Sequence, residues 1–143
     1  MKDFKHREVV TARPNETVAK AIQKLVEYDR GSLPVVNDEN KLIGILTERD
    51  IVRKCFALGV DPGKIEIHDI MTGEVAICIP EDDLDYAIGV MKQKRIRHLP
   101  IVEGRKIAGM ISMRDLCAVQ YEETKAEIRY SKLMPRRTGG PMY

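Results

Sequence analysis

Residues 44–50 are Gly-Ile-Leu-Thr-Glu-Arg-Asp, and residues 109–115 are Gly-Met-Ile-Ser-Met-Arg-Asp. In each stretch a short apolar run leads to a hydroxyl residue, and an aspartate follows three positions later. This pattern predicts a strand that passes directly into a helix, with Thr47 or Ser112 at the start of that helix. Its recurrence within 143 residues indicates an internally duplicated chain.

The duplication extends well beyond these two stretches. A shift of 66 residues aligns identical residues in turns and in apolar segments, and after a one-residue difference in a loop the shift becomes 65. The aligned residues include Asp3, Glu8, Val9, Pro14, Ala21, Ile22, Leu33, Pro34 and Val36 with Asp69, Glu74, Val75, Pro80, Ala87, Ile88, Leu99, Pro100 and Val102. One register kept across several elements indicates two copies of one structural unit.

Each copy shows the same order of local signals. A short apolar strand ends at a proline and a polar cluster suited to capping a helix, at 15–17 in the first copy and 81–83 in the second. Apolar residues then recur at the spacing of one helical face. Two short apolar runs follow that resemble a hairpin, and Thr47 or Ser112 opens a second helix. The expected strands are 9–12, 33–36 and 42–46 in the first copy, and 75–79, 99–102 and 107–111 in the second. We therefore expect an α+β fold of two units, packed together with pseudo-twofold symmetry because each alone leaves apolar surface open.

Several of these segments together resemble CBS motifs, named after cystathionine beta-synthase. The resemblance rests on the two stretches quoted above, on Leu33-Pro34-Val35-Val36 and Leu99-Pro100-Ile101-Val102, and on the lead-in Asp69-Ile70-Met71-Thr72. It covers residues 3–120. We expect a first CBS motif at 1–58, a linker at 59–68, a second motif at 69–120, and a C-terminal helix and basic tail at 121–143.

The resemblance implies a Bateman module of the stand-alone type. Such modules have two clefts between the copies, which in many members bind AMP, ADP, ATP, S-adenosylmethionine or NAD, and they usually dimerise into a flat disk. The expected function is regulatory, with an adenine nucleotide as ligand, no required cofactor and a homodimeric state. The alternative is a protein–protein interaction scaffold whose clefts stay empty. We expect no enzyme, because the sequence offers no nucleophile and base pair, no phosphate-cradling Gly-rich loop and no carboxylate dyad.

Asp50 and Asp115 are the candidate ribose ligands, because an ionised aspartate can accept hydrogen bonds from two neighbouring hydroxyl groups. Thr47 and Ser112 add a hydroxyl at a helix start, beside backbone N–H groups and the positive end of the helix dipole. The same spacing is also a capping box, in which these residues only satisfy the N–H groups of their own helix. Spacing alone favours the capping role, whereas the resemblance favours the ligand role.

By analogy with the family, each cleft combines the Ser/Thr-x-x-Asp of one copy with the first strand and the loop before Leu-Pro of the other. Site A would use Thr47, Arg49, Asp50, Ile77, Ile79, Ile96, Arg97 and His98, and site B would use Thr11, Arg13, Arg30, Gly31, Ser32, Ser112, Arg114 and Asp115. Arg97-His98 lies where the gamma subunit of AMP-activated protein kinase holds nucleotide phosphate, so site A is the expected phosphate site. The alternative for Arg97 and His98 is a solvated loop.

Composition restricts the remaining choices. The net charge of +2 comes from residues 120–143, which hold five Lys or Arg against three Glu, while the rest of the chain is balanced. This charge distribution argues against nucleic acid as a partner. Cys55, Cys78 and Cys117 are expected to be reduced, buried thiols, and no ligand spacing indicates a metal site. No segment resembles a membrane span or a secretion signal, so we expect a cytoplasmic protein without membrane contact.

The end of the chain combines two signals. Residues 120–133 have a thin apolar stripe that favours a helix, which Pro135 would end. The basic residues beyond it form either a frayed terminus or a segment that docks on a partner.

Overall fold

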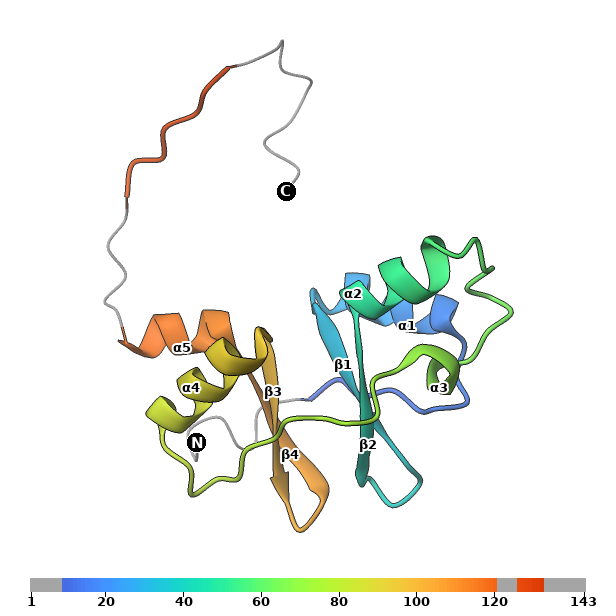
Figure 1. Cartoon of the computed structure of the whole chain (residues 1–143), viewed down its shortest axis with the longest axis horizontal. Helices are drawn as coiled ribbons and strands as arrows, with labels where there is room; N and C mark the ends of the chain where they lie inside the picture. Colours follow the sequence, from blue (N-terminus) through green and yellow to red (C-terminus); the bar gives the residue numbers. More distant parts are fainter. Residues whose placement is uncertain (1–8, 121–125, 133–143) are drawn as a thin grey trace.

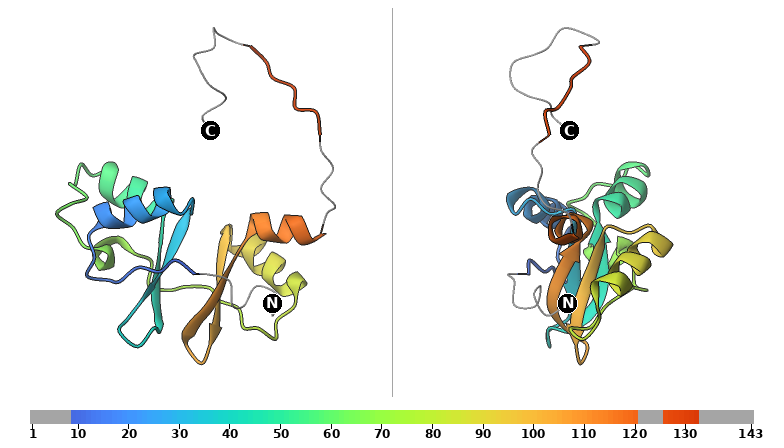
Figure 2. Two further views of the ribbon diagram at one scale, coloured as in Figure 1. Left: turned by 180° about the vertical axis from the view of Figure 1, so that it is seen from behind. Right: turned by 90° about the vertical axis from the view of Figure 1, so that its left-hand side faces the viewer.

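The computed structural model describes residues 9–120 and 126–132, and its two β-hairpins stand side by side (Figure 1). Figure 2 shows from two further directions that helices lie beside each hairpin. The first repeat contains α1 (Val18–Glu27), β1 (Ser32–Val36), β2 (Leu42–Thr47), α2 (Glu48–Ile51) and the π-helical turn η2 (Val52–Phe56). The short α3 (Ile67–Ile70) follows, and the second repeat contains α4 (Leu84–Lys94), β3 (His98–Glu103), β4 (Lys106–Ser112) and α5 (Met113–Gln120). The α+β duplication expected from the sequence is confirmed.

The first strand expected in each copy is wrong in length. Ala12 forms a single parallel bridge with Val35, and Cys78 forms the equivalent bridge with Ile101. Ala12 N donates to Pro34 O at 3.0 Å, and Val36 N donates to Ala12 O at 2.9 Å. The next bond of a parallel ladder would need an N–H on Pro34, which proline lacks. The proline that marks the motif in the sequence therefore limits this strand to one bridge.

The two hairpins form as expected, with matching registers. Leu33 pairs with Leu46 in the first hairpin and Leu99 pairs with Ile111 in the second, and all four side chains are buried. Gly104 has a φ of 54° in the β3–β4 turn, a left-handed backbone conformation that glycine adopts without steric cost.

The helix starts also follow the sequence. The Thr17 side chain accepts a hydrogen bond from Lys20 N at the start of α1. The Asp83 side chain accepts one from Tyr86 N at the start of α4. Both residues belong to the polar clusters that predicted a helix cap, and each satisfies an N–H that has no partner within its helix.

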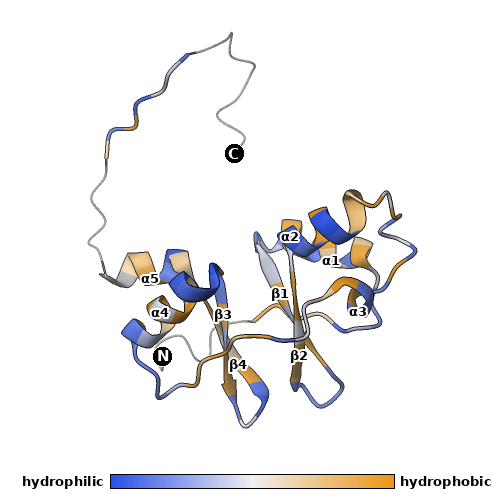
Figure 3. Ribbon diagram, in the orientation of Figure 1, coloured by the Kyte–Doolittle hydropathy of each residue, from blue (hydrophilic) through white to orange (hydrophobic). Residues whose placement is uncertain are grey.

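Each repeat has its own apolar core. Leu33, Leu46 and Ile51 lie in the first core, and Leu99, Ile111 and Leu116 lie in the second. The first core also contains Ile67 and Ile70 of α3, so the segment after the first repeat packs back onto it. Figure 3 shows the hydrophobic residues of the strands and of α3. The domain boundaries drawn from the sequence stay a prediction.

The hairpin tips connect the two repeats through a reciprocal pair of hydrogen bonds. Leu42 N donates to Arg105 O at 2.9 Å, and Ile107 N donates to Asn40 O at 3.3 Å. Leu42 and Ile107 are equivalent under the shift of 65, as are Asn40 and Arg105. An exchange of this kind between equivalent residues is the mark of a twofold relation, which confirms the expected pseudo-symmetry.

Two predictions about the second half need correction. Residues 126–132 have no helical structure and are exposed, so the helix predicted there is wrong for this part of the tail. An isolated polar stretch without a packed apolar face gains too little to stay helical. The part of that prediction on residues 121–125 and 133, and the basic end beyond it, lie outside the described residues. Cys55 and Cys78 are buried as expected, whereas Cys117 is exposed on α5.

Among the helices of the described ranges, none combines the length and the apolar character that crossing a bilayer requires.

Candidate functional site

Both Ser/Thr-x-x-Asp stretches form complete capping boxes. Thr47 N donates to Asp50 Oδ2 at 3.1 Å, and Asp50 N donates to Thr47 Oγ1 at 3.1 Å. Ser112 N donates to Asp115 Oδ2 at 2.9 Å, and Asp115 N donates to Ser112 Oγ at 3.1 Å. The capping role left open by the sequence is therefore confirmed in both repeats. Since a carboxylate offers about four lone-pair sites, capping leaves room for further hydrogen bonds.

In the first repeat, other protein groups also contact the aspartate. Asp50 is 8% exposed. Its Oδ1 lies 3.2 Å from Lys54 Nζ and accepts from Thr72 Oγ1 at 3.3 Å. Lys54 and Thr72 thus make contacts with the Asp50 carboxylate that the hydroxyl groups of a ligand would otherwise make.

The segment that carries Thr72 lies along β2. Ile45 N donates to Thr72 O and Thr72 N donates to Ile45 O, each at 2.9 Å. A Cβ placed on Gly44 would lie 2.7 Å from Met71 Sδ, so Gly44 permits this close approach. The lead-in to the second repeat therefore covers the part of β2 that precedes Asp50.

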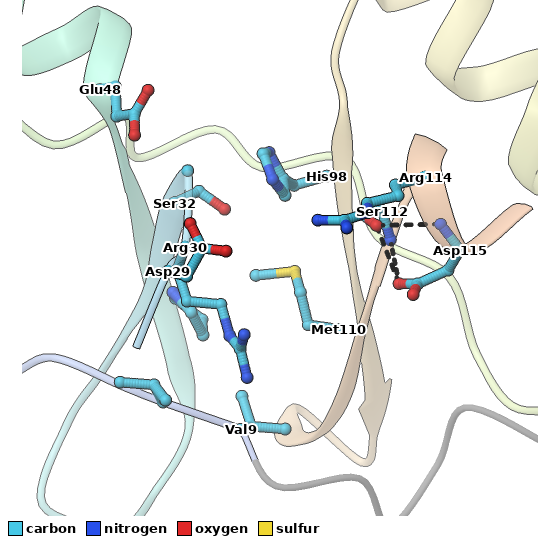
Figure 4. Close-up of a pocket in the computed structure, with 13 residues that line it drawn as sticks. Val9, Asp29, Arg30, Ser32, Glu48, His98, Met110, Ser112, Arg114 and Asp115 are labelled. Atoms are coloured by element: carbon cyan, nitrogen blue, oxygen red, sulfur yellow. Dashed lines mark hydrogen bonds between the residues drawn. The ribbon is translucent and has the colours of Figure 1, made fainter. Parts of the chain in front are cut away.

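The second Ser/Thr-x-x-Asp lies on the wall of a cavity of about 590 Å³ between the repeats (Figure 4). Figure 4 shows Asp29, Arg30, Ser32 and Glu48 on the side of the first repeat, and His98, Met110, Ser112, Arg114 and Asp115 on the side of the second. The lining consists of Val9, Val10, Asp29, Arg30, Gly31, Ser32, Pro34, Glu48, His98, Met110, Ser112, Arg114 and Asp115. A molecule in this cavity would contact both repeats.

Ser32 brings an unused polar atom to this cavity. The residue is 3% exposed, and its Oγ has no hydrogen-bond partner within the described parts of the protein. Leaving a buried hydroxyl unpaired costs about 1–3 kcal/mol. An unpaired hydroxyl on the wall of a cavity is therefore suited to a polar group of a bound molecule.

His98 lies between the repeats. β3 pairs it with Ser112 of β4, and a Cβ placed on Gly31 would lie 3.0 Å from His98 Cε1. Burial lowers the pKa of His98, the positive charge of Arg97 lowers it further, and the carboxylate of Asp115 partly opposes both effects. The imidazole is therefore favoured in its neutral form, which can donate one hydrogen bond and accept another.

The cavity brings together most of the residues predicted for site B, namely Arg30, Gly31, Ser32, Ser112, Arg114 and Asp115. Thr11 and Arg13 are not among its lining residues. The Thr11 carbonyl accepts from Lys24 Nζ at 2.9 Å, and the Arg13 guanidinium pairs with Asp38 at 2.7 Å. Val9 and Val10 line the cavity in their place.

The residues predicted for site A are not brought together in the same way. His98, which the sequence predicts for site A, lines the cavity built on Ser112 and Asp115. The cause is the β3–β4 register, which fixes His98 beside Ser112. Ile77 lines a smaller cavity of about 210 Å³ with Leu42, Ile43, Gly73, Val75, Val102 and Arg105. Thr47, Arg49, Asp50, Ile79, Ile96 and Arg97 line neither of these cavities.

Several lining residues were missed in the sequence. Asp29 directly precedes Arg30, and Glu48 directly precedes Arg49, and both arginines were predicted site residues. A charged residue next to a predicted site residue is a signal that could have identified Asp29 and Glu48. Val9, Val10, Pro34 and Met110 give no such signal, because apolar residues in strands usually belong to a core. Only the tertiary structure places these four residues on the wall of the cavity.

The structure thus defines a class of protein, a duplicated α+β module with a cavity lined from both copies. The family model described as "CBS domain" matches residues 1–57 and again residues 67–122. The chain belongs to the CBS domain family. Pairs of this kind are generally regulatory, ligand-binding modules.

Among the curated relatives is "Uncharacterized protein MK0525" from Methanopyrus kandleri, 38% identical over 116 residues, which are 80% of this chain and 59% of that protein. Another is "Uncharacterized 17.7 kDa protein in bps2 3'region" from Acidianus ambivalens, 34% identical over 76% of this chain and 65% of that protein. The chain thus spans about three fifths of these relatives.

Solved structures agree with the family assignment. A "putative signal-transduction protein with CBS domains from Burkholderia ambifaria MC40-6" aligns with a TM-score of 0.76 at 33% identity, over 84% of this chain and 88% of that one. The "CBS domain pair of protein MJ0100" aligns with a TM-score of 0.74 at 28% identity, over 82% of this chain and 92% of that one. The latter was solved in complex with 5′-methylthioadenosine and S-adenosyl-L-methionine.

Proposed function

We propose that this chain is a regulatory module that binds an adenosyl compound in the cavity between its repeats and does not catalyse a reaction. The unpaired hydroxyl of Ser32, on the wall opposite Ser112 and Asp115, is the observation on which the proposal depends. The adenosyl ligands of the MJ0100 pair support the class of ligand.

The lining supplies the groups that an adenosyl compound needs. The Asp115 carboxylate can accept hydrogen bonds from ribose hydroxyls, and Ser112 holds it in place from its own repeat. Val9, Val10 and Met110 offer apolar contacts for a flat base. We assign the ribose to Asp115 and not to Asp50, because Asp115 lines the cavity and Asp50 does not.

A ligand in this position would also explain regulation. Because residues of both repeats line the cavity, occupancy favours the arrangement of the repeats that contacts the ligand best. A change in that arrangement would alter the surfaces that other proteins meet.

Calorimetric titration with adenosine, 5′-methylthioadenosine, S-adenosylmethionine, AMP, ATP and NAD tests the proposal in wild type and Ser32→Ala. We expect the variant to bind the tightest of these about three- to tenfold more weakly, as for one lost hydrogen bond. Its ligand-free Tm should be unchanged or higher, because an unpaired buried hydroxyl is removed. Ser131→Ala, at an exposed serine, is the matched control. Absence of binding by every compound would overturn the proposal.

A second candidate function is favoured by an exposed apolar face on the first repeat. Val26, Val52, Phe56 and Leu58 are 76%, 57%, 58% and 70% exposed. We propose that this face contacts a second copy of the chain, as expected for a homodimer, since four large apolar side chains in water favour association. The interaction-scaffold alternative would use the same face without any ligand.

Light scattering separates these cases. Phe56→Ser, which exposes no core residue, should shift the molecular mass toward that of a monomer while leaving ligand binding in place. An unchanged mass would count against this face. A monomeric variant that retains ligand binding would support the sensor function over the scaffold.

A further inference from the structure

Among the residues that the structure describes, the cavity lining is acidic. Three carboxylates, those of Asp29, Glu48 and Asp115, face two guanidinium groups, those of Arg30 and Arg114, and His98 is favoured in its neutral form. Figure 4 shows Asp29 and Glu48 on the wall opposite Ser112 and Asp115. The two carboxylates of the first repeat are therefore available to the part of a ligand that lies beyond a ribose held at Asp115.

The negative charges of Asp29 and Glu48 occur only in the first of the two repeats. Under the shift of 66, Asp29 corresponds to Arg95, and both residues have a left-handed backbone, with φ of 51° and 54°. Under the shift of 65, Glu48 corresponds to Met113 at the same helix start. The same two backbone positions thus hold two acids in the first repeat and a base and an apolar residue in the second. The fold does not demand acids there, because the second copy forms without them.

Charge then separates the adenosyl ligands. A phosphate group brings negative charge toward Asp29 and Glu48, which are both exposed, so the repulsion is expected at low salt and is screened as salt is added. A sulfonium or ammonium group on the 5′ side of the nucleoside would be attracted by the same carboxylates. Arg30 and Arg114 could at the same time bind a carboxylate of the ligand through paired hydrogen bonds. A zwitterionic substituent therefore matches the mixed lining, and a polyphosphate does not.

We propose that the cavity selects an adenosyl ligand whose 5′ substituent carries a cationic sulfonium or ammonium group and no phosphate, with Asp29 and Glu48 as the specificity-determining residues. This inference rests on the proposed adenosyl site at Ser112 and Asp115 and names the ligand class of that site. It differs from the expectation of a phosphate site at Arg97, a residue that is exposed and does not line this cavity.

Titration calorimetry at low salt tests the inference with S-adenosylmethionine, adenosine, AMP and ATP. We expect S-adenosylmethionine to bind at least about tenfold more tightly than AMP or ATP, with uncharged adenosine between them. The preference should shrink as salt is added, because it is electrostatic.

The double variant Asp29→Asn with Glu48→Gln keeps the shapes of both side chains, and asparagine tolerates the left-handed backbone at 29. We expect it to lose at least about tenfold of the preference for S-adenosylmethionine over AMP. Glu27→Gln with Glu74→Gln removes the same charge from exposed positions outside the cavity and should keep the wild-type preference. A Tm close to that of wild type shows that each variant is folded.

The outcomes distinguish the two proposals. Tighter binding of AMP or ATP, or equal binding of all four compounds, would overturn the charge selection and leave the adenosyl site standing. An unchanged preference in the double variant would also overturn the role of Asp29 and Glu48. If none of the compounds binds, the adenosyl site itself is wrong, and this inference falls with it.

Discussion

The two aspartates that are equivalent in sequence have different surroundings. Asp50 is held by Lys54 and Thr72 in addition to its capping box, whereas Asp115 lines the cavity. Lys54 corresponds to Val119 in the second repeat, so the duplication does not preserve a lysine at this position. A residue's role here depends on its neighbours more than on its motif.

Substitution of each aspartate by asparagine should separate the roles. We expect Asp115→Asn to weaken adenosyl binding by about 10- to 100-fold, because charge-assisted hydrogen bonds to the ribose are lost. Asp50→Asn should leave affinity within about twofold, since the change removes an ion pair with Lys54 that lies outside the cavity, and should lower stability by about 1 kcal/mol. Titration calorimetry and urea unfolding measure the two effects. Equal loss of affinity in both variants would contradict the assignment of the ribose to Asp115.

His98 should make stability depend on pH. Because its pKa is lowered in the folded protein, folding opposes protonation of the imidazole. The contribution of neutral His98 to the free energy of unfolding is therefore fully present above the pKa of the unfolded state, which is about 6.5. That contribution is lost as the pH falls through this value toward the lower pKa of the folded state. We expect Tm to fall between about pH 7.5 and pH 5.5, and to fall less in His98→Gln. An equal fall of Tm in wild type and His98→Gln would mean that groups other than His98 cause it.

At the scale of elements, proline and glycine decide where segments can approach each other. Pro34 and Pro100 limit the first strand of each repeat to one bridge, because neither can donate to the ladder. Gly44 lets Met71 and Thr72 lie against β2. The lead-in to the second repeat is consequently part of the first repeat's structure.

Two glycine substitutions test this packing. A Cβ on Gly44 would meet Met71 Sδ at 2.7 Å and Thr72 O at 3.0 Å, so we expect Gly44→Ala to cost about 1–3 kcal/mol of stability. Gly89 lies in α4 with open space around its Cα, so Gly89→Ala should stabilise the protein by about 0.5–1 kcal/mol through helix propensity. Urea unfolding measures both. A neutral Gly44→Ala would mean that the lead-in shifts without cost.

At the scale of the whole molecule, contacts between the two repeats border the cavity and connect the hairpin tips. Their hairpin tips exchange hydrogen bonds between equivalent residues, and Gly31 of one repeat lies against His98 of the other. The cavity lies between the repeats, so its shape depends on how they are set relative to each other. The affinity for a ligand in the cavity should therefore depend on the arrangement of the two repeats.

The contact between Gly31 and His98 can be tested by a double-mutant cycle. A Cβ on Gly31 would lie 3.0 Å from His98 Cε1, so we expect Gly31→Ala to push the repeats apart at the cavity and weaken ligand binding by about tenfold. His98→Ala in the same chain should restore most of that loss by removing the obstructing ring. Additive effects of the two changes in calorimetry would show that the contact does not control the cavity.

The sequence by itself determined the duplication, the helices and the hairpin of each repeat, the polar clusters that cap α1 and α4, and the family. These features depend on local spacing, which repeats faithfully in both copies. Only the tertiary structure decided that Ser112 and Asp115 border the cavity of about 590 Å³, that Asp29 and Glu48 line it, and that His98 lines it next to Ser112. These facts depend on strand register and on contacts between repeats, which no spacing within one copy specifies.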